Sequence, residues 1–262
     1  MYNFEFEQPS TVADAAAALG GEAQALGGGQ TLIPTLKQRL AQPSKLVSLT
    51  GISEMTGVRT GDDGAVCVGG ATTHATVAAE AASLYAGLSA LASHIGDPAV
   101  RNRGTIGGSL ANNDPAACYP AAALGSGATI VTNAREISAD DFFTGMFSTA
   151  LDDNEIITEV RFPVPDASNY QKFVQPASRF ALVGVFVAKF ADGVRVAITG
   201  ASESGVFRWS DAEKALSSNF SADALESMSL TGDGMINDLH GTGAYRAHIA
   251  KVMTKRAVAA AG

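Results

Sequence analysis

Three consecutive glycines, Gly27, Gly28 and Gly29, are followed by Gln30 and Thr31 in the stretch ALGGGQTLIPTL. Residues without a Cβ atom let a ligand approach the backbone, and the start of a following helix leaves N–H groups without partners. Such N–H groups bind anions, and a diphosphate suits a loop of this kind. An ordinary strand-to-helix turn uses glycine in the same way, so this motif alone leaves both interpretations open.

A second glycine-bearing stretch, RNRGTIGGSLANNDPAACYP, begins at Arg101. Its glycines stand among short polar side chains, including Thr105 and Ser109. A ligand with a diphosphate, a polyol chain and a large planar ring needs two such surfaces, and FAD has this shape. Neither the Rossmann glycine spacing nor a Walker lysine accompanies the first loop, which disfavours nicotinamide dinucleotides and nucleoside triphosphates.

Composition excludes several other classes of function. The chain carries 18 Lys and Arg against 26 Asp and Glu, a net charge of −8, so we expect no nucleic-acid partner. Only Cys67 and Cys118 are present, too few for a disulfide framework, a zinc cage or an iron–sulfur cluster, and we expect no metal site. The sequence shows neither a signal-peptide pattern nor an apolar run of membrane-spanning length, which predicts a cytoplasmic protein.

The elements that must position these motifs can be read from local signals. Thr11 and Asp14 resemble a capping box, and the following alanine-rich helix should stop at Gly20 and Gly21. Four-, three- and four-residue steps between apolar side chains predict a helix over 83–96. The remaining expected elements are strands at 2–9, 23–27, 45–49, 64–77, 129–133 and 155–163, a helix at 32–41 and an aromatic loop at 140–149.

The last third of the chain predicts a hairpin followed by helices. Two apolar runs, 180–190 and 194–202, flank Asp192 and Gly193, a strong hairpin signal. We expect helices at 210–218, 221–230 and 243–261. The proline-bounded stretch 163–169 is the candidate boundary between domains, which gives a first domain at 1–165, divided into 1–55 and 56–165, and a second domain at 170–262.

The ordered set of motifs resembles the FAD-binding medium subunit of the molybdenum hydroxylase (xanthine oxidase) family, above all its carbon monoxide dehydrogenase branch. The two glycine motifs, the Thr72–His74 segment, the strand EIITEVRFP and the closing AYR helix carry this resemblance over essentially the whole chain. It implies an α+β fold. A PCMH-type, vanillyl-alcohol-oxidase-like FAD-binding unit of two α/β subdomains would precede a C-terminal domain of antiparallel strands and helices.

The resemblance also implies which residues touch FAD, while it implies no catalytic residue in this chain. Cys118 stands where relatives usually have an acidic residue that can bind sugar hydroxyls, and Val174 and Gln175 stand where relatives tend to have Lys or Arg. Arg179 is a candidate substitute for that cation. The implied FAD-binding residues are Gly27, Gly28, Gly29, Gln30, Thr31, Ile95, Thr105, Ile106, Gly107, Gly108, Ser109, Cys118, Ile157 and Phe180.

By the same resemblance, the chain is an electron-transfer subunit. A large subunit with molybdenum-pterin and a small subunit with two-iron two-sulfur clusters are the implied partners, in a dimer of heterotrimers that has no transmembrane segment and could still touch a membrane peripherally. Two alternatives stay open: a flavin oxidoreductase that acts alone, and a scaffold subunit with weakened FAD binding. A bulky residue at Gly28 is expected to abolish FAD retention and to leave the fold largely intact.

Overall fold

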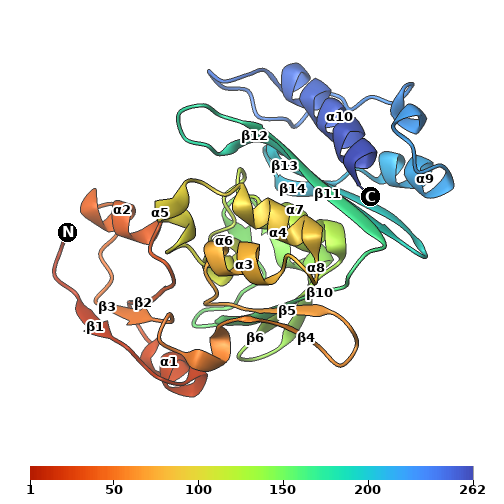
Figure 1. The fold of residues 1–262 in the computed structure, drawn as a ribbon. Helices are drawn as coiled ribbons and strands as arrows, with labels where there is room; N and C mark the ends of the chain where they lie inside the picture. Colours follow the sequence, from red (N-terminus) through yellow and green to blue (C-terminus); the bar gives the residue numbers. More distant parts are fainter. Residues whose placement is uncertain (262) are drawn as a thin grey trace.

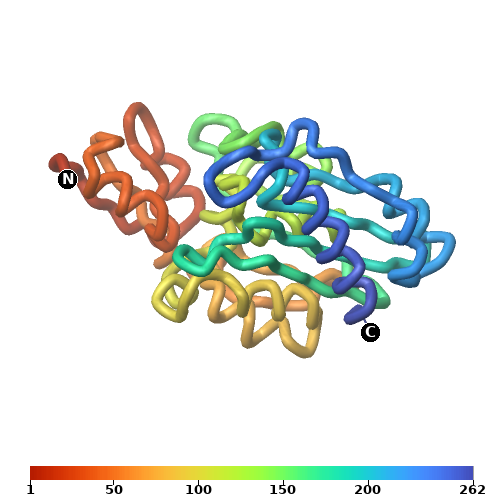
Figure 2. The backbone as a smooth tube through the Cα atoms, turned by 90° about the horizontal axis from the view of Figure 1, so that it is seen from above, coloured from red at the N-terminus to blue at the C-terminus, as the bar shows by residue number. Residues whose placement is uncertain are grey.

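Three main β-sheets, each with its own helices, follow one another along the chain in the computed structural model, which describes residues 1–261 (Figure 1). The first sheet contains three parallel strands in the order β1-β3-β2. Its elements are β1 (Glu5–Glu7), α1 (Val12–Ala18), β2 (Ala23–Leu26), α2 (Leu32–Lys37) and β3 (Lys45–Ser48). This order of strands and helices confirms the prediction for the first 50 residues. Figure 2 shows this N-terminal unit as a lobe beside the rest of the molecule.

Local signals explain the N-terminal unit. The Thr11 hydroxyl accepts a hydrogen bond from the Asp14 N–H, which is the N-cap half of the predicted capping box, but the Asp14 carboxylate accepts from the Thr11 hydroxyl and not from the Thr11 N–H. Helix α1 then ends ahead of Gly21, whose φ of +61° is the left-handed conformation that favours glycine. Short crossover helices between parallel strands complete the α/β unit.

The middle unit is built on a five-stranded antiparallel sheet in the order β4-β5-β10-β6-β7. Leu88 and Leu91 of the predicted helix at 83–96 are fully buried, and this helix is α4. The elements of this unit are η1 (Ser53–Met55), β4 (Val58–Thr60), β5 (Val66–Gly69), α3 (His74–Glu80), α4 (Ala86–Ser93), α5 (Pro98–Arg101), α6 (Ile106–Asn112), α7 (Tyr119–Ser126), β6 (Thr129–Thr132), β7 (Glu136–Ser138), α8 (Ala139–Phe142), β8 (Phe143–Gly145), β9 (Ser148–Thr149) and β10 (Ile157–Phe162).

The C-terminal unit is a four-stranded antiparallel sheet in the order β11-β12-β13-β14. Strands β12 and β13 form the predicted hairpin, with Phe190 paired to Gly193. Residues 181–188 are all buried because helices cover both faces of this sheet, α10 on one and α7 on the other (Figure 1). The elements are β11 (Ala167–Val174), β12 (Ala181–Phe190), β13 (Gly193–Ser202), β14 (Gly205–Arg208), α9 (Ser210–Ser218), η2 (Ala222–Leu225) and α10 (Gly243–Ala260).

The middle and C-terminal units share one apolar core. Phe186 and Ala197 of the C-terminal sheet belong to the same buried cluster as Leu88 and Tyr119 of the middle unit. A second cluster lies between the C-terminal sheet and helices α9 and α10, and a third lies under the N-terminal sheet. The proposed boundary at 163–169 stays a prediction, and strand β11 begins within it at Ala167.

Three predictions of local secondary structure were wrong. The strand expected at 64–77 ends at Gly69, because Thr73 caps a new helix, α3, through the Thr76 N–H. The loop expected at 140–149 contains the end of α8 and the β8–β9 hairpin, and its Phe142 is fully buried, whereas Phe147 is exposed. The helix expected at 221–230 is reduced to the short 3-10 helix η2. Among residues 1–261, no helix has both the length and the apolar composition needed to cross a membrane.

Candidate functional site

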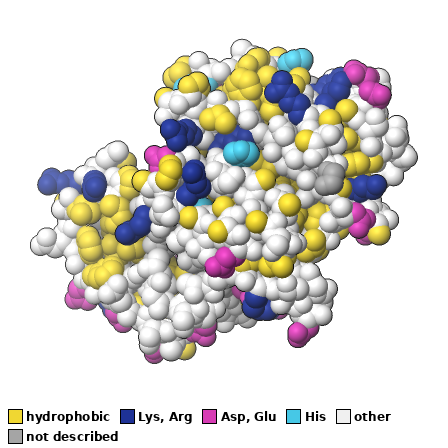
Figure 3. Space-filling model, in the orientation of Figure 1, with side chains coloured by type: hydrophobic (Ala, Val, Ile, Leu, Met, Phe, Trp, Pro, Cys, Tyr) yellow, Lys and Arg dark blue, Asp and Glu magenta, His cyan; other side chains and the backbone are white. Residues whose placement is uncertain are grey.

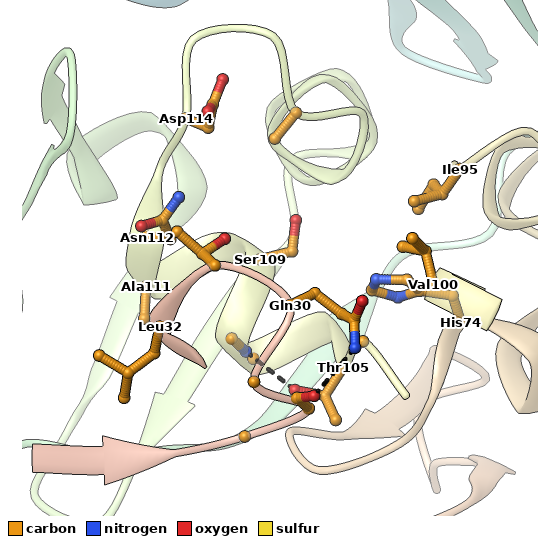
Figure 4. A pocket seen from close by; sticks show the side chains of 18 of the residues that line it. Gln30, Leu32, His74, Ile95, Val100, Thr105, Ser109, Ala111, Asn112 and Asp114 are labelled. Carbon is orange, nitrogen blue, oxygen red and sulfur yellow. Dashed lines mark hydrogen bonds between the residues drawn. The ribbon is translucent and has the colours of Figure 1, made fainter. Parts of the chain in front are cut away.

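A cleft of about 650 Å³ lies between the N-terminal unit and the rest of the molecule. This volume falls within the range of small-molecule and cofactor sites. The first glycine loop forms one wall, the segment 104–118 forms another, and the turn at 178–180 contributes from the C-terminal unit. Figure 4 shows Gln30 of the first loop and Thr105 of the second segment facing the same space, with His74 and Ile95 nearby.

The first loop offers an array of free donors. It joins β2 to α2, and Gly29 adopts a φ of +72°, which reverses the chain there. Among the described residues, no group accepts a hydrogen bond from the backbone N–H groups of residues 28–32. The Gln30 side chain donates to the Gly28 carbonyl at 3.3 Å and braces the loop. N–H groups without protein partners at the start of a helix can bind an anion.

The first-loop glycines also serve packing. A Cβ atom on Gly28 would overlap the carbonyl group of Arg103, and one on Gly27 would lie 2.7 Å from the Thr105 hydroxyl oxygen. The two glycine motifs therefore touch each other backbone to backbone. The expectation that the fold would largely tolerate a bulky residue at Gly28 is wrong, because such a residue must push the two motifs apart.

The second segment uses most of its N–H groups internally. The Thr105 hydroxyl caps helix α6 by accepting from the Gly108 N–H at 3.2 Å, and the Gly107 N–H donates to the Gly70 carbonyl at 2.9 Å. The side chains of Ser109 and Asn112 line the cleft and make no hydrogen bond among the described residues. This wall therefore offers side-chain donors and acceptors, whereas the first loop offers backbone donors.

Apolar residues also line the cleft. Ile95 and Val100 line it from the α4–α6 region, and Ile157 lines it from the start of β10. Phe180 lies in the turn between β11 and β12, where its carbonyl accepts from the Gln175 N–H at 2.9 Å, and its side chain remains 47% exposed. Apolar lining residues with an accessible aromatic suit a flat ring system.

Cations also line the cleft. The Lys172 ammonium donates to the His94 carbonyl at 2.9 Å, and Arg179 lies in the same turn as Phe180. Figure 3 shows Lys and Arg side chains gathered where the N-terminal unit adjoins the larger part of the molecule. These positive charges favour an anionic ligand, although exposed charges contribute modestly.

His74 is a buried polar residue at the cleft. Its side chain is 5% exposed, and its Nδ1 has no hydrogen-bond partner among the described residues. Burial, and secondarily the charge of Arg101, lowers the pKa of His74 to about 4. The imidazole is therefore neutral at pH 7, and it packs beneath Gly104, where a Cβ atom would lie 2.5 Å from Nε2.

The structure brings together all but one of the residues implied by the resemblance. Ile106 is the exception, because its side chain is fully buried in the core and its N–H donates to the Thr72 carbonyl, so neither group faces the cleft. The residues that line the cleft are Gly27, Gly28, Gly29, Gln30, Thr31, Ile95, Thr105, Gly107, Gly108, Ser109, Cys118, Ile157 and Phe180.

Sequence reasoning missed three charged residues at the cleft, of which Glu155 is paired with Arg135. Lys172 lies two residues before Val174 in strand β11 and lines the cleft, whereas Val174 is exposed and does not line it. Asp114 lies on the same wall as Cys118 and contributes a carboxylate there, with one oxygen accepting from the Ala116 N–H. Asp114 belongs to the second glycine-bearing stretch, so its carboxylate could have been predicted as a site residue from the sequence of that stretch.

Comparison with known proteins gives a family. Residues 2–165 match the family model described as "FAD binding domain in molybdopterin dehydrogenase". The carbon monoxide dehydrogenase medium chain of Hydrogenophaga pseudoflava is 32% identical over 98% of this chain and 96% of its own length. The nicotine 6-hydroxylase medium subunit of Paenarthrobacter nicotinovorans is 33% identical with the same coverage.

Solved structures agree with the sequence relatives. Reconstituted CO dehydrogenase from Oligotropha carboxidovorans contains a chain with a TM-score of 0.87 and 29% identity, covering 98% of this chain and 97% of its own. Quinoline 2-oxidoreductase from Pseudomonas putida 86 gives a TM-score of 0.88 and 28% identity, covering 98% and 96%. The expected α+β fold class is thereby confirmed.

Proposed function

Because the chain belongs to the family of FAD binding domains in molybdopterin dehydrogenase, we propose that it holds FAD in the cleft and acts as an electron-transfer subunit of a molybdenum hydroxylase complex. The observation that carries this proposal is the pairing of two different walls around one cleft. Backbone N–H groups of residues 28–32 without partners among the described residues line the same cleft as a segment of short polar side chains and several apolar residues.

The residues present fit the parts of FAD. The N–H groups of the first loop would hold the diphosphate, while Ser109, Asn112 and Asp114 would hold hydroxyl groups. Ile95, Ile157 and Phe180 would provide the apolar surroundings that a flat ring needs. Asp114 offers a carboxylate on the wall where Cys118 replaces the usual acid, which supports FAD binding over a decayed site.

When bound, FAD supplies the capacity to accept and release electrons one or two at a time. This chain's own contribution is position and electrostatics. Lys172 and Arg179 place positive charge at the cleft, which would stabilise a negatively charged cofactor. His74 stays neutral near neutral pH because its pKa is lowered to about 4, so it adds no charge to the site.

The partners follow from what the relatives are. The relatives are named as a medium chain of carbon monoxide dehydrogenase and a medium subunit of nicotine 6-hydroxylase. We therefore propose a large molybdenum-pterin subunit and a small iron–sulfur subunit as partners, in a dimer of heterotrimers. Similar medium chains serve different substrates in these relatives, so we infer that the partner subunit selects the substrate. The cytoplasmic location stays a prediction.

Purification tests the proposal directly. We expect the full chain, purified with excess FAD, to retain flavin in a one-to-one ratio, measured by absorbance and by release of FAD on denaturation. We expect no turnover of small alcohols or amines without partner subunits. Colourless protein that refuses FAD would support a scaffold, and turnover by the isolated chain would support a flavin oxidoreductase that acts alone.

A further inference from the structure

A buried arginine of the terminal helix lies behind the cleft. Arg246 in α10, part of the AYR stretch, is 2% exposed. Its Nη1 donates to the carbonyls of Leu182 and Gly200, both at 2.8 Å, and its Nη2 donates to both carboxylate oxygens of Asp238 at 2.8 Å. The guanidinium thus fixes strands β12 and β13 to each other and to the loop before α10.

The two β13 residues at this junction reach the second wall of the cleft. The Gly200 N–H donates to the Pro115 carbonyl at 2.7 Å. The fully buried Thr199 hydroxyl lies 2.9 Å from the Pro115 carbonyl oxygen and 2.8 Å from that of Ala117. Gly200 has a φ of +82°, and a Cβ atom there would crowd the Ala181 carbonyl at 2.6 Å, so the position requires glycine.

The loop held in this way carries part of the cleft lining. Asp114, Ala116, Ala117 and Cys118 all line the cleft, and the loop runs from the left-handed Asn113 to the start of α7. Within the loop, Asp114 accepts from the N–H groups of Ala116 and Ala117 and so closes only a local turn. The contacts from Thr199 and Gly200 connect this turn to the C-terminal sheet.

We propose that Thr199, Gly200 and Arg246 are positioning residues that set the second wall of the cleft from behind. The proposal rests on the proposed function, because the wall is the FAD-binding wall. The family model ends at residue 165, so these three residues lie outside the matched segment. The C-terminal sheet therefore shapes the cofactor site through hydrogen bonds of residues that do not themselves contact the ligand.

The test compares two buried threonines. Thr254 is also fully buried, but its hydroxyl donates to the Ala250 carbonyl within α10, away from the cleft. The full chain with Cys67→Ala serves as the parent, so that Cys118 is its one thiol. Thr199→Val, Thr199→Ser and Thr254→Val are added to it, and each protein is measured for FAD Kd by fluorescence titration, for Tm without FAD, and for the rate of Cys118 modification by a disulfide reagent.

We expect Thr199→Val to weaken FAD binding roughly tenfold, the effect of about one lost hydrogen bond. It should also accelerate Cys118 modification, while Thr199→Ser keeps the hydroxyl and restores both values. Thr254→Val should lower the Tm about as much as Thr199→Val does, and it should leave the FAD Kd and the rate of Cys118 modification at parent values. If Thr199→Val does not fold, Arg246→Lys gives the same comparison, because lysine retains the charge and loses the forked contacts.

Each result decides the proposal. Unchanged Kd and thiol rate in Thr199→Val, or equal changes in Thr254→Val, would overturn the positioning role. If the parent itself binds no FAD, the proposed function fails on its own. The thiol rate then still decides whether Thr199 sets the wall that carries Cys118.

Discussion

The two glycine motifs look alike in sequence and do different work in the structure. The first loop leaves the N–H groups of residues 28–32 without protein partners. The second segment spends the N–H groups of Gly107 and Gly108 on Gly70 and Thr105 and presents the side chains of Ser109 and Asn112. One motif is thus a backbone donor surface, and the other is an anchored helix start with polar side chains.

This difference shows that glycine content alone does not identify a phosphate-binding loop. Gly104, Gly107 and Gly70 each lack a Cβ because another group of this chain occupies the space. The decisive property is whether the N–H groups remain free after folding. Substitutions that separate packing from donor function test this distinction.

The largest effect is expected at Gly28, which serves both the packing of the two motifs and the donor surface of the first loop. Gly28→Val places side-chain atoms against the Arg103 carbonyl and forces the two motifs apart. We expect complete loss of bound FAD and a loss of stability of roughly 3 kcal/mol or more. Flavin content and urea unfolding measure both. Gly20→Ala is the control, since a Cβ there meets open space, and retention of full flavin by Gly28→Val would contradict the assignment.

His74, which lies beneath the second segment, should make the stability of the fold depend on pH. The pKa of folded His74 is about 4, below the ordinary 6.5, since burial and the Arg101 charge oppose protonation. Between pH 6.5 and 4 the unfolded chain binds a proton that the folded chain does not, so the free energy of unfolding falls as pH falls through this window. We expect the free energy of unfolding to fall by roughly 3 kcal/mol between pH 6.5 and 4.

The control for the acid effect is His74→Gln. Unfolding by urea, followed at several pH values, gives the difference in stability between this variant and the natural chain. That difference should change between pH 6.5 and 4 and stay constant above pH 7. A difference that does not depend on pH would show that His74 is not the group responsible.

Alanine at two neighbouring glycines of α6 should affect different properties, namely stability at Gly107 and FAD affinity at Gly108. A Cβ on Gly107 would lie 2.6 Å from the Gly70 carbonyl oxygen, so Gly107→Ala should cost roughly 1–3 kcal/mol of stability. A Cβ on Gly108 meets only the Thr105 hydroxyl oxygen at 3.0 Å, and the gain in helix propensity offsets this contact. Gly108→Ala should keep its Tm and bind FAD more weakly. The reverse pattern would show that the second segment is not anchored as described.

The smallest effect should come from the cation that sequence reasoning missed. Lys172→Met removes a charge from the cleft, and we expect FAD affinity to fall by up to roughly fivefold, since a half-exposed charge contributes about 1 kcal/mol at most. The loss should shrink at high salt. Lys189→Met, which removes an ammonium group near the Phe220 ring, is the matched control. Equal affinities of the two variants would exclude an electrostatic role for Lys172.

Local signals were enough where a short stretch of chain decides its own structure. The Thr11–Asp14 cap, the turn at Gly21 and the β12–β13 hairpin were predictable because each depends on neighbouring residues. Helix α6 was not predicted, because a seven-residue helix with two glycines has little propensity of its own. Its place is fixed by Thr72 and Gly70, which accept hydrogen bonds from its first turn.

Sequence alone indicated the family, the cofactor class and thirteen of the residues that line the cleft, because glycines and caps mark places where the backbone must come close to another group. Folding alone settled which group lies beside each glycine. The tertiary structure showed the backbone of Arg103 beside Gly28, the carbonyl of Gly70 beside Gly107, and open donors at residues 28–32. A missing Cβ atom permits close approach, but the partner that approaches comes from another part of the chain and is settled by folding.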